Sequence, residues 1–437
     1  MEEPSGLFFI FVLMTIERLH QLFLKYPVAC TDTRQIHEAC MFFALKGDNF
    51  DGNKFAADAL RKGAKYVVAD SVDAAKDERI ILVDDTLKTL QQLATYHRKY
   101  CTATVIALTG SNGKTTTKEL MFAVLSKKFN TIATQGNFNN HIGVPLTLLR
   151  IVKETEIAIV EMGANHQKEI DLLCNIALPD HGYITNFGKA HLEGFGGIEG
   201  VIKGKSELYD YLIKHEKHIF FNADDSIQAS KLASYKKKTG YSTEAREFLT
   251  VSFLGALPYV VLKLGESRIS TQLIGSYNFS NCCAALLVGS YFKVPIDDIK
   301  EALEYYIPEN NRSQLIEREH HSIVLDAYNA NPTSMRAALE NFSQMNGMAK
   351  TVFLGDMFEL GVESAKEHQA TARLVEDINF DNAFLIGENF YKTDTTLKKY
   401  RSFEDLSEYL KKHPLGPSQI LIKGSRGMAL ERILEIL

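Results

Sequence analysis

The chain has 437 residues, a length that corresponds to about three domains. Its composition, 45% hydrophobic and 24% charged, is ordinary for a globular protein. The net charge of −5 gives no sign of a nucleic-acid or membrane surface, so we expect neither as a partner. The six cysteines show no Cys-x-x-Cys spacing, which fits unpaired thiols in a reducing compartment, the cytoplasm.

An apolar run of eight residues, 7–14, lies near the start of the chain. It is much shorter than the roughly 20 residues that span a bilayer. Glu2 and Glu3 precede it, whereas a signal peptide carries positive charge there. The run is either a buried strand or part of an untidy leader before a true start at Met14, and we favour the leader.

Deletion of residues 1–13 is therefore expected to leave activity and melting temperature nearly unchanged. The acidic start, the short apolar run and the methionine at position 14 motivate this expectation. Activity assays and thermal melts of the two purified proteins would check it. A collapse in soluble yield would instead indicate that Leu7 to Leu13 form a core strand.

The first predicted domain covers residues 1–100 and is a small α/β unit. Helical spacing predicts a helix over 16–24, and Asp85 is a plausible N-cap for a helix that ends near Tyr100. A turn-rich loop is expected over 46–52. Short buried strands are predicted at 41–45, 65–69 and 80–83.

The second predicted domain covers residues 101–311. Its strands alternate with helices, which predicts a mostly parallel sheet. The β-branched, Gly-punctuated stretch 249–274 indicates an antiparallel flap, and a helix is expected over 278–292. The predicted parallel strands are 103–109, 157–161, 182–186 and 218–222.

The third predicted domain, residues 312–437, has the clearest alternation and indicates a doubly wound, Rossmann-like fold. Strands are predicted at 322–326, 351–354, 383–386 and 419–422, and helices near 333–345, 364–377, 403–412 and 426–437. The predicted fold class is thus α/β with three domains.

One stretch, Thr109-Gly-Ser-Asn-Gly-Lys-Thr-Thr116, joins a predicted strand to a predicted helix. Its glycines allow backbone N–H groups to approach phosphate oxygens, and the helix N-terminus adds positive charge. Lys114 can then reach the outer phosphates, and the Thr115 hydroxyl can ligate Mg²⁺. Leu108 stands where the usual P-loop has its first Gly. The stretch predicts that the central domain is a P-loop-type ATPase domain with a mostly parallel sheet. The alternative is a chance Gly-rich turn.

Polar residues follow neighbouring strands of the second domain at the edge where ligands bind in parallel sheets. Glu161 ends one predicted strand, Asn186 ends another, and His191 lies in the loop after it. A carboxylate and an imidazole beside a phosphate site suit a divalent cation. The alternatives are a surface histidine and a strand-end salt bridge.

Two strand-to-helix turns of the third domain carry polar clusters, Asp326-Ala-Tyr-Asn-Ala-Asn-Pro332 and Lys423-Gly-Ser-Arg426. Each cluster could simply cap a helix. Because both are expected at the same sheet edge, they could also form a site for an anion or a carboxylate.

Several stretches together resemble the Mur ligase family, ATP-dependent amide-forming enzymes of bacterial cell-wall synthesis. The family's phosphate loop also lacks the early Gly, and the resemblance covers nearly the whole chain from Met14. The stretches are 109–117, Glu161-Met-Gly-Ala-Asn165, Thr185-Asn-Phe-Gly-Lys-Ala-His-Leu-Glu193, Asn278-Phe-Ser-Asn281 and Asp326-Ala-Tyr-Asn-Ala-Asn331.

A narrower resemblance is to the branch of the family that adds D-alanyl-D-alanine to a UDP-N-acetylmuramoyl tripeptide. It implies a cytoplasmic enzyme that uses ATP and Mg²⁺, and we expect a monomer. The stretches that carry it are 135–146, 161–166, Gly355-Asp-Met-Phe-Glu-Leu-Gly361 and Lys423-Gly-Ser-Arg426.

The resemblance implies a role for each matching residue. The ATP phosphates would be bound by Lys114 and by the other loop residues Thr109, Gly110, Ser111, Asn112, Gly113, Thr115 and Thr116. Other parts of the nucleotide would contact Asn278, Arg312 and Asp326. Thr115, Glu161 and His191 would bind metal. The substrates would contact Thr33, Arg34, Lys46, Asn137, Asn140, Asn329, Asn331, Lys423, Ser425 and Arg426.

Lys205 matches the lysine that the family carbamylates with CO₂, which would give a further metal ligand. With Lys114 and His191 it completes the expected catalytic set. A carbamate forms only from a neutral amine, so the pKa of this lysine must be lowered. Residues 198–212 are predicted to be a helix on which Leu208 and Leu212 share the face of Lys205, whereas Lys203 points elsewhere. The alternative is an ordinary lysine that pairs with an anion.

Two other kinds of function are also compatible with the sequence. Another Mur-type ligase, including the folylpolyglutamate type, would share the core and the chemistry. A nucleotide-dependent binding protein without ligase activity would share only the phosphate loop.

Overall fold

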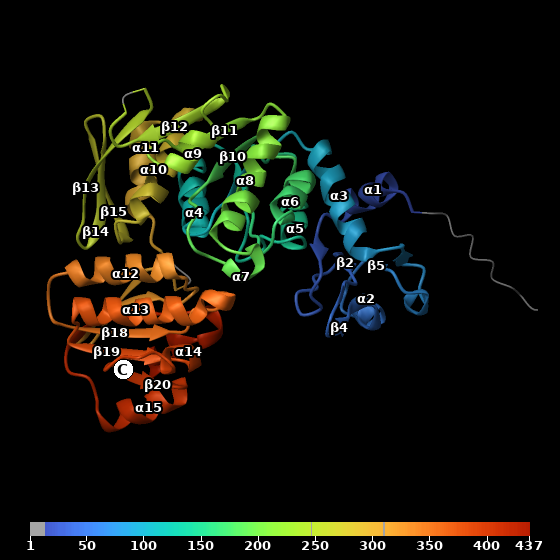
Figure 1. Cartoon of the computed structure of the whole chain (residues 1–437). Helices are drawn as coiled ribbons and strands as arrows, with labels where there is room; N and C mark the ends of the chain where they lie inside the picture. Colours follow the sequence, from blue (N-terminus) through green and yellow to red (C-terminus); the bar gives the residue numbers. More distant parts are fainter. Residues whose placement is uncertain (1–13, 246, 309–310) are drawn as a thin grey trace, which may run out of the picture.

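The structure is a computed structural model that describes residues 14–245, 247–308 and 311–437. The run at residues 7–13 and its two interpretations lie outside the described residues. Three large sheets define a first, a middle and a third domain, and the middle domain contacts both of the others (Figure 1).

The first domain is built on a four-stranded parallel sheet in the order β1-β2-β5-β6, with a small hairpin formed by β3 and β4. The Asp85 side chain accepts a hydrogen bond from Lys88 N and caps α3, as predicted. The helices are α1 (Ile16–Lys25), α2 (Ala56–Arg61) and α3 (Thr86–Tyr100). The strands are β1 (Ala29–Cys30), β2 (Met41–Phe43), β3 (Lys46–Gly47), β4 (Phe50–Asp51), β5 (Tyr66–Ala69) and β6 (Ile80–Leu82).

The middle domain contains a nine-stranded sheet in the order β15-β14-β13-β12-β11-β10-β7-β9-β8. Along this order, every neighbouring pair from β13 to β8, which includes β7, is parallel, and β13, β14 and β15 form the predicted antiparallel flap. They are β7 (Thr104–Thr109), β8 (Thr131–Ala133), β9 (Ile157–Glu161), β10 (His181–Ile184), β11 (His218–Asn222), β12 (Lys238–Ser242), β13 (Leu249–Ala256), β14 (Tyr259–Leu264) and β15 (Ser267–Ile274).

Helices cover both faces of this parallel sheet, so its central strands are apolar on both sides. In β7, Val105 and Ala107 belong to one hydrophobic core, whereas Ile106 and Leu108 belong to the core on the opposite face. The helices are α4 (Lys114–Leu125), α5 (Gly143–Leu148), α6 (Glu169–Ala177), α7 (Leu192–Phe195), α8 (Ile198–Lys214), α9 (Ser226–Lys231), α10 (Asn278–Tyr291) and α11 (Ile296–Tyr305).

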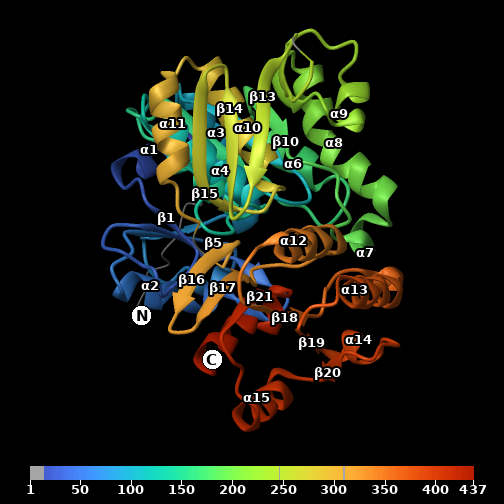
Figure 2. The same cartoon turned by 90° about the vertical axis from the view of Figure 1, so that its left-hand side faces the viewer.

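The third domain is doubly wound around a six-stranded sheet in the order β16-β17-β21-β18-β19-β20, parallel except for β16. Its strands are β16 (Gln314–Arg318), β17 (His321–Asp326), β18 (Ala349–Gly355), β19 (Asn382–Ile386), β20 (Lys398–Tyr400) and β21 (Ser418–Lys423). Its helices are α12 (Pro332–Gln344), α13 (Ser364–Ile378), α14 (Glu388–Tyr391) and α15 (Phe403–Lys412), with the 3₁₀ turn η3 (Gly361–Glu363). In Figure 2 the helix α12 faces the middle domain.

Two sequence predictions need correction. The helix predicted over 426–437 is instead a pair of short 3₁₀ turns, η4 (Arg426–Met428) and η5 (Leu430–Glu435). Ala429 between them has a left-handed φ of 48°, which no α-helix accommodates. The loop predicted over 46–52 contains the β3–β4 hairpin.

The strand predicted at 182–186 ends earlier than expected, at Ile184. The side chains of Thr185 and Asn186 are hydrogen-bonded to the backbone of Asn112 in the loop after β7, so they hold that loop. This early end of β10 is a feature of the site.

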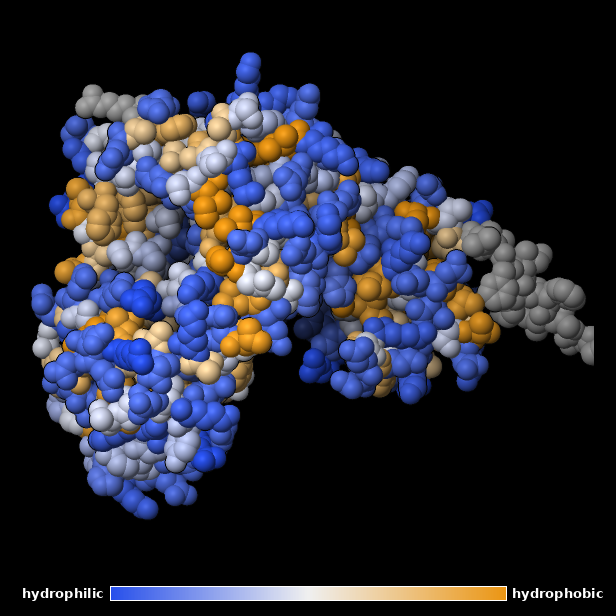
Figure 3. Space-filling view, in the orientation of Figure 1, coloured by the Kyte–Doolittle hydropathy of each residue, from blue (hydrophilic) through white to orange (hydrophobic). Residues whose placement is uncertain are grey.

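The face of the molecule in Figure 3 is mostly hydrophilic, and its hydrophobic side chains lie in small separate groups. Within the described residues, no helix is both long enough and apolar enough to cross a membrane.

Candidate active site

The loop between β7 and α4 has the geometry predicted for a phosphate-binding loop. Gly113 has a left-handed φ of 79° and is followed by Lys114, the first residue of α4. Ser111 N–H donates to the Asn186 carbonyl at 3.0 Å, and Asn112 N–H donates to the Asn186 side-chain oxygen at 3.1 Å. The segment after β10 thus fixes the loop at a helix N-terminus, where an anion is favoured.

Both loop glycines are required by close packing. A Cβ on Gly110, whose φ is 141°, would lie 1.9 Å from the Thr185 hydroxyl oxygen. A Cβ on Gly113 would lie 2.5 Å from the side-chain oxygen of Asn281 on α10. The loop can therefore come this close to its neighbours only without side chains at these two positions.

Lys114 folds back over its own loop. Its Nζ donates to the carbonyl oxygens of Gly110 at 2.7 Å and Ser111 at 3.3 Å. Burial lowers the pKa of Lys114, the charge of Glu161 opposes this effect, and the charge of Arg312 adds to it. The ammonium group is thus held beside the loop N–H groups, where the outer phosphates are expected.

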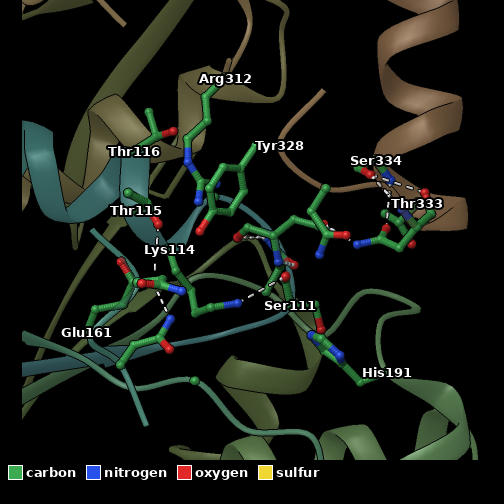
Figure 4. A pocket seen from close by; sticks show the side chains of 18 of the residues that line it. Ser111, Lys114, Thr115, Thr116, Glu161, His191, Arg312, Tyr328, Thr333 and Ser334 are labelled. Atoms are coloured by element: carbon green, nitrogen blue, oxygen red, sulfur yellow. Dashed lines mark hydrogen bonds between the residues drawn. The ribbon is translucent and has the colours of Figure 1, made fainter. Parts of the chain in front are cut away.

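A cavity of about 690 Å³ opens above the loop, between the middle and third domains. Figure 4 shows Lys114, Thr115 and Glu161 on one side of it and residues of the third domain on the other. The predicted residues that line it are Ser111, Asn112, Gly113, Lys114, Thr115, Thr116, Asn137, Asn140, Glu161, His191, Asn278, Arg312, Asp326, Asn329, Asn331 and Lys423.

Glu161 and Thr115 form one polar wall of the cavity. The Thr115 hydroxyl donates to Glu161 Oε1 at 3.2 Å, and Asn139 Nδ2 donates to the same oxygen at 2.8 Å. The other oxygen, Oε2, is buried and has no hydrogen-bond partner among the described residues. An unpartnered buried carboxylate oxygen is costly without a cation, so these groups fit Mg²⁺.

The described residues contain no cluster of three or more His, Cys, Asp or Glu side chains placed to hold a metal ion. Mg²⁺ is commonly bound through one or two carboxylates together with substrate phosphates rather than by a protein cage. The arrangement at Glu161 and Thr115 fits that mode.

Across the cavity, the end of β17 supplies a charged group. Asp326 is paired with Lys423 at the end of the neighbouring strand β21 and accepts from Ser313 N–H at 3.2 Å. Arg312 stacks on the Tyr328 ring, with 3.7 Å from its guanidinium carbon to the ring centroid. These contacts bring the two polar turns of the third domain together at one edge, as predicted.

The third domain also contacts the phosphate loop directly. Asn331 caps α12 by accepting from Ser334 N–H at 2.9 Å, and its Nδ2 donates to Asn112 Oδ1 at 2.6 Å. Thr333 Oγ1 accepts from Lys189 N–H at 3.0 Å. Asn331 therefore caps a helix, as one of the two predicted alternatives held, and it also joins two domains. The anion or carboxylate site stays a prediction.

Asn278 has both side-chain groups engaged. Its Nδ2 donates to the Ile274 carbonyl at 2.7 Å, and its Oδ1 accepts from Asn281 Nδ2 at 2.7 Å. It is buried at the cavity wall beside the loop. Its expected contact with adenine stays a prediction.

Lys205 is buried in α8, with a side chain 1% exposed, whereas Lys203 is exposed. Its Nζ donates to the Ala164 carbonyl at 3.0 Å and lies 4.9 Å from the Phe195 ring centroid. Burial is the main cause of a pKa for Lys205 far below the ordinary value, and the charge of Lys114 lowers it further. Both effects favour the neutral amine, which lies directly behind Ala164, a residue that lines the cavity.

His191 lies in the loop before α7 and has a left-handed φ of 52°. Its ring points toward Ser111 in Figure 4. The ring Nδ1 contacts the carboxylate of Glu359 in the third domain. His191 and Glu161 line the same cavity, and a shared metal stays a prediction.

Three family models match consecutive parts of the chain: the Mur ligase family catalytic domain over 29–98, the Mur ligase middle domain over 108–289, and the Mur ligase glutamate ligase domain over 311–426. The UDP-N-acetylmuramoyl-tripeptide–D-alanyl-D-alanine ligase of Bacillus subtilis is 35% identical over 93% of this chain and 92% of its own. The Escherichia coli enzyme of that name is 33% identical with the same coverage. The chain belongs to the Mur ligase family.

Solved structures agree with this assignment. A crystal structure of MurF from Acinetobacter baumannii has a TM-score of 0.85 and 31% identity, covering 96% of this chain and 98% of that one. MurF from Thermotoga maritima in complex with ADP has a TM-score of 0.82 and 27% identity, covering 94% and 97%. The predicted three-domain α/β fold of this Mur ligase is confirmed.

Some predicted residues of this Mur ligase lie outside the cavity lining. Thr109 Oγ1 donates to the Met162 carbonyl at 2.8 Å, so it holds β7 to the segment after β9. Ser425 Oγ accepts from Phe358 N–H at 2.9 Å, and Arg426 pairs with Glu431 at 2.8 Å. Their substrate contacts stay predictions.

The predicted residues of the first domain also do not line the cavity. Arg34 pairs with Asp32 at 2.7 Å, and Lys46 pairs with Asp70 at 2.8 Å. Both cations belong to the first domain of this Mur ligase, as does Thr33. The role of all three in UDP binding stays a prediction.

Sequence reasoning missed several residues of the site. Asn139, Asn281 and Tyr328 lie within stretches that carried the family resemblance, so their motifs contained a signal. Glu359 also lies in such a stretch, but no local pattern indicated its contact with His191.

Proposed function

We propose that this Mur ligase joins D-alanyl-D-alanine to a UDP-N-acetylmuramoyl tripeptide, with conversion of ATP to ADP and phosphate. The observation that carries the proposal is the cavity in which the phosphate loop faces polar residues of the third domain. This chain matches 92% of the length of the Bacillus subtilis and Escherichia coli relatives, and both are named for that reaction.

We propose that each domain holds one ligand. Residues 1–100 would bind the UDP-muramyl substrate, 101–311 would bind ATP, and 312–437 would bind the incoming dipeptide. Separate sheets and the contacts of the third domain with the phosphate loop support this division. The enzyme would act as a cytoplasmic monomer.

The reaction must bring two anions together, because the tripeptide carboxylate attacks the γ-phosphate to form an acyl phosphate. Lys114, Arg312 and the loop N–H groups would offset that repulsion. The dipeptide amine then attacks the acyl carbon, and phosphate leaves. Docking of the third domain would exclude water that could hydrolyse the acyl phosphate.

Thr115, Glu161 and His191 would hold Mg²⁺, which when bound neutralises phosphate charge. We propose that Lys205 forms a carbamate, in which the neutral amine adds to CO₂ and releases a proton to give an anionic oxygen ligand. Burial and the lowered pKa of Lys205 support this step, because only the neutral amine reacts.

Phosphate release by the purified full-length enzyme tests the ligase proposal. It is expected only when ATP, a UDP-muramyl tripeptide and D-alanyl-D-alanine are all present, and the peptide product should appear in equal amount. Equal ATP turnover without either substrate would contradict a ligase and leave a nucleotide-dependent protein. Turnover with a folyl substrate instead would assign the folylpolyglutamate-type activity.

A further inference from the structure

The loop between β18 and η3 of the third domain, residues 356–360, reaches across to His191 of the middle domain. Glu359 in this loop places its carboxylate against His191 Nδ1. Nδ1 is buried and lies within ion-pair distance of this carboxylate. The Glu359 carbonyl also accepts from Glu193 N–H at 3.3 Å.

The two ring nitrogens of His191 are therefore not equivalent. Nδ1 is buried against Glu359, and no hydrogen bond of the ring to any other described residue is formed. The His191 side chain is 18% exposed and lines the cavity, and its ring points toward the phosphate loop in Figure 4. The second nitrogen, Nε2, is thus left for a ligand.

A carboxylate at one imidazole nitrogen fixes both the tautomer and the orientation of the ring. With the proton on Nδ1 facing Glu359, the lone pair lies on Nε2. We propose that Glu359 is the positioning residue that makes His191 a metal ligand, an inference that rests on the metal role proposed above for His191. Because the two residues belong to different domains, this half of the metal site is complete only when the third domain is docked.

The loop holds Glu359 rigidly enough for this role. The Asp356 carboxylate accepts two backbone N–H groups of α14, at 2.9 Å each. Met357 N–H donates to His368 Nε2 at 3.0 Å, and Phe358 N–H donates to Ser425 Oγ at 2.9 Å. Three consecutive residues before Glu359 are thus fixed to the third domain, and the carboxylate moves with that domain.

The test is Mn²⁺ binding to the full-length enzyme with saturating ADP, followed by electron paramagnetic resonance. Glu359→Ala is expected to weaken Mn²⁺ affinity by about 10- to 100-fold, the range for losing such a partner of a ligating histidine. Glu359→Gln keeps an acceptor for Nδ1–H and should recover much of that loss. The Mg²⁺ concentration for half-maximal turnover should be lowest for the parent enzyme, higher for Glu359→Gln and highest for Glu359→Ala.

Glu363→Gln is the matched control, because this carboxylate lies in η3 after the same loop and pairs only locally with Lys366, at 2.9 Å. It should keep the Mn²⁺ affinity of the parent enzyme. In a His191→Ala background, Glu359→Ala should cause almost no further loss, since Glu359 acts through that ring.

The outcomes separate this inference from the proposed function. If His191→Ala weakens Mn²⁺ binding and Glu359→Ala does not, the positioning role is overturned and Glu359 only docks the domain. If His191→Ala itself leaves Mn²⁺ binding unchanged, the metal role of His191 fails. Additive losses in the double variant would also overturn the inference.

Discussion

The Lys114→Ala enzyme is expected to remain folded and to lose on the order of 10²- to 10³-fold in turnover, the scale for removing one charge contact to a transition state. Lys114 lies beside Arg312 and Glu161 at the start of α4, and its ammonium group interacts with the loop carbonyls. A γ-phosphate bound at the loop would take over those interactions. Phosphate release with all three substrates, together with a thermal melt, measures the effect.

Lys127→Ala is the control for the loss of one positive charge. Lys127 is exposed after the far end of α4 and pairs with Glu301 at 2.9 Å. Surface pairs of this kind contribute about 0–1 kcal/mol, so activity and stability should hardly change. Near-normal turnover of Lys114→Ala would move the phosphate site elsewhere in the cavity.

Elements whose signals are local were predicted well. The strands at 157–161 and 218–222 have the predicted limits, because each is a short apolar run buried on both faces of a parallel sheet. The helix predicted at 426–437 failed because its apolar spacing does not reveal the left-handed Ala429. The chain there is held by packing of Leu430 and Ile433 in the core rather than by helix propensity.

In the site, too, the features with local sequence signals were predicted, whereas those that depend on tertiary contacts were not. The phosphate loop was predictable because Gly110, Gly113 and Lys114 lie together in the sequence between a strand and a helix. The link between Asn112 and Asn331, and that between His191 and Glu359, join residues far apart in the chain. They depend on how the third domain docks, which no local pattern encodes.

For Lys205, the family resemblance selected one of two nearby lysines, and the helical spacing predicted that the two would point in different directions. Leu208 and Leu212, on the face of Lys205, are fully buried, and Lys205 is buried with them while Lys203 is exposed. The structure thus confirms the environment that was predicted to lower the pKa of Lys205. The carbamate itself stays a proposal.

Lys205→Ala is expected to be nearly inactive, with a loss on the order of 10²-fold or more if the lysine supplies an anionic ligand for charge stabilisation. Lys205→Arg should be no better, because arginine keeps a positive charge but forms no carbamate. Lys203→Ala is the matched control and should keep substantial activity. Thermal melts show whether a variant is folded, since replacing Lys205 removes the hydrogen bond to the Ala164 carbonyl.

The arginine variant separates a carbamate from a simple cation. If Lys205 acts only through positive charge, arginine preserves that charge and a folded Lys205→Arg enzyme should remain active, which would refute the carbamate. If a carbamate is needed, the parent enzyme should also lose turnover when CO₂ and bicarbonate are removed, and recover it when bicarbonate returns. The Lys205→Arg enzyme should not respond to bicarbonate, because its guanidinium stays protonated and has no neutral amine to add to CO₂.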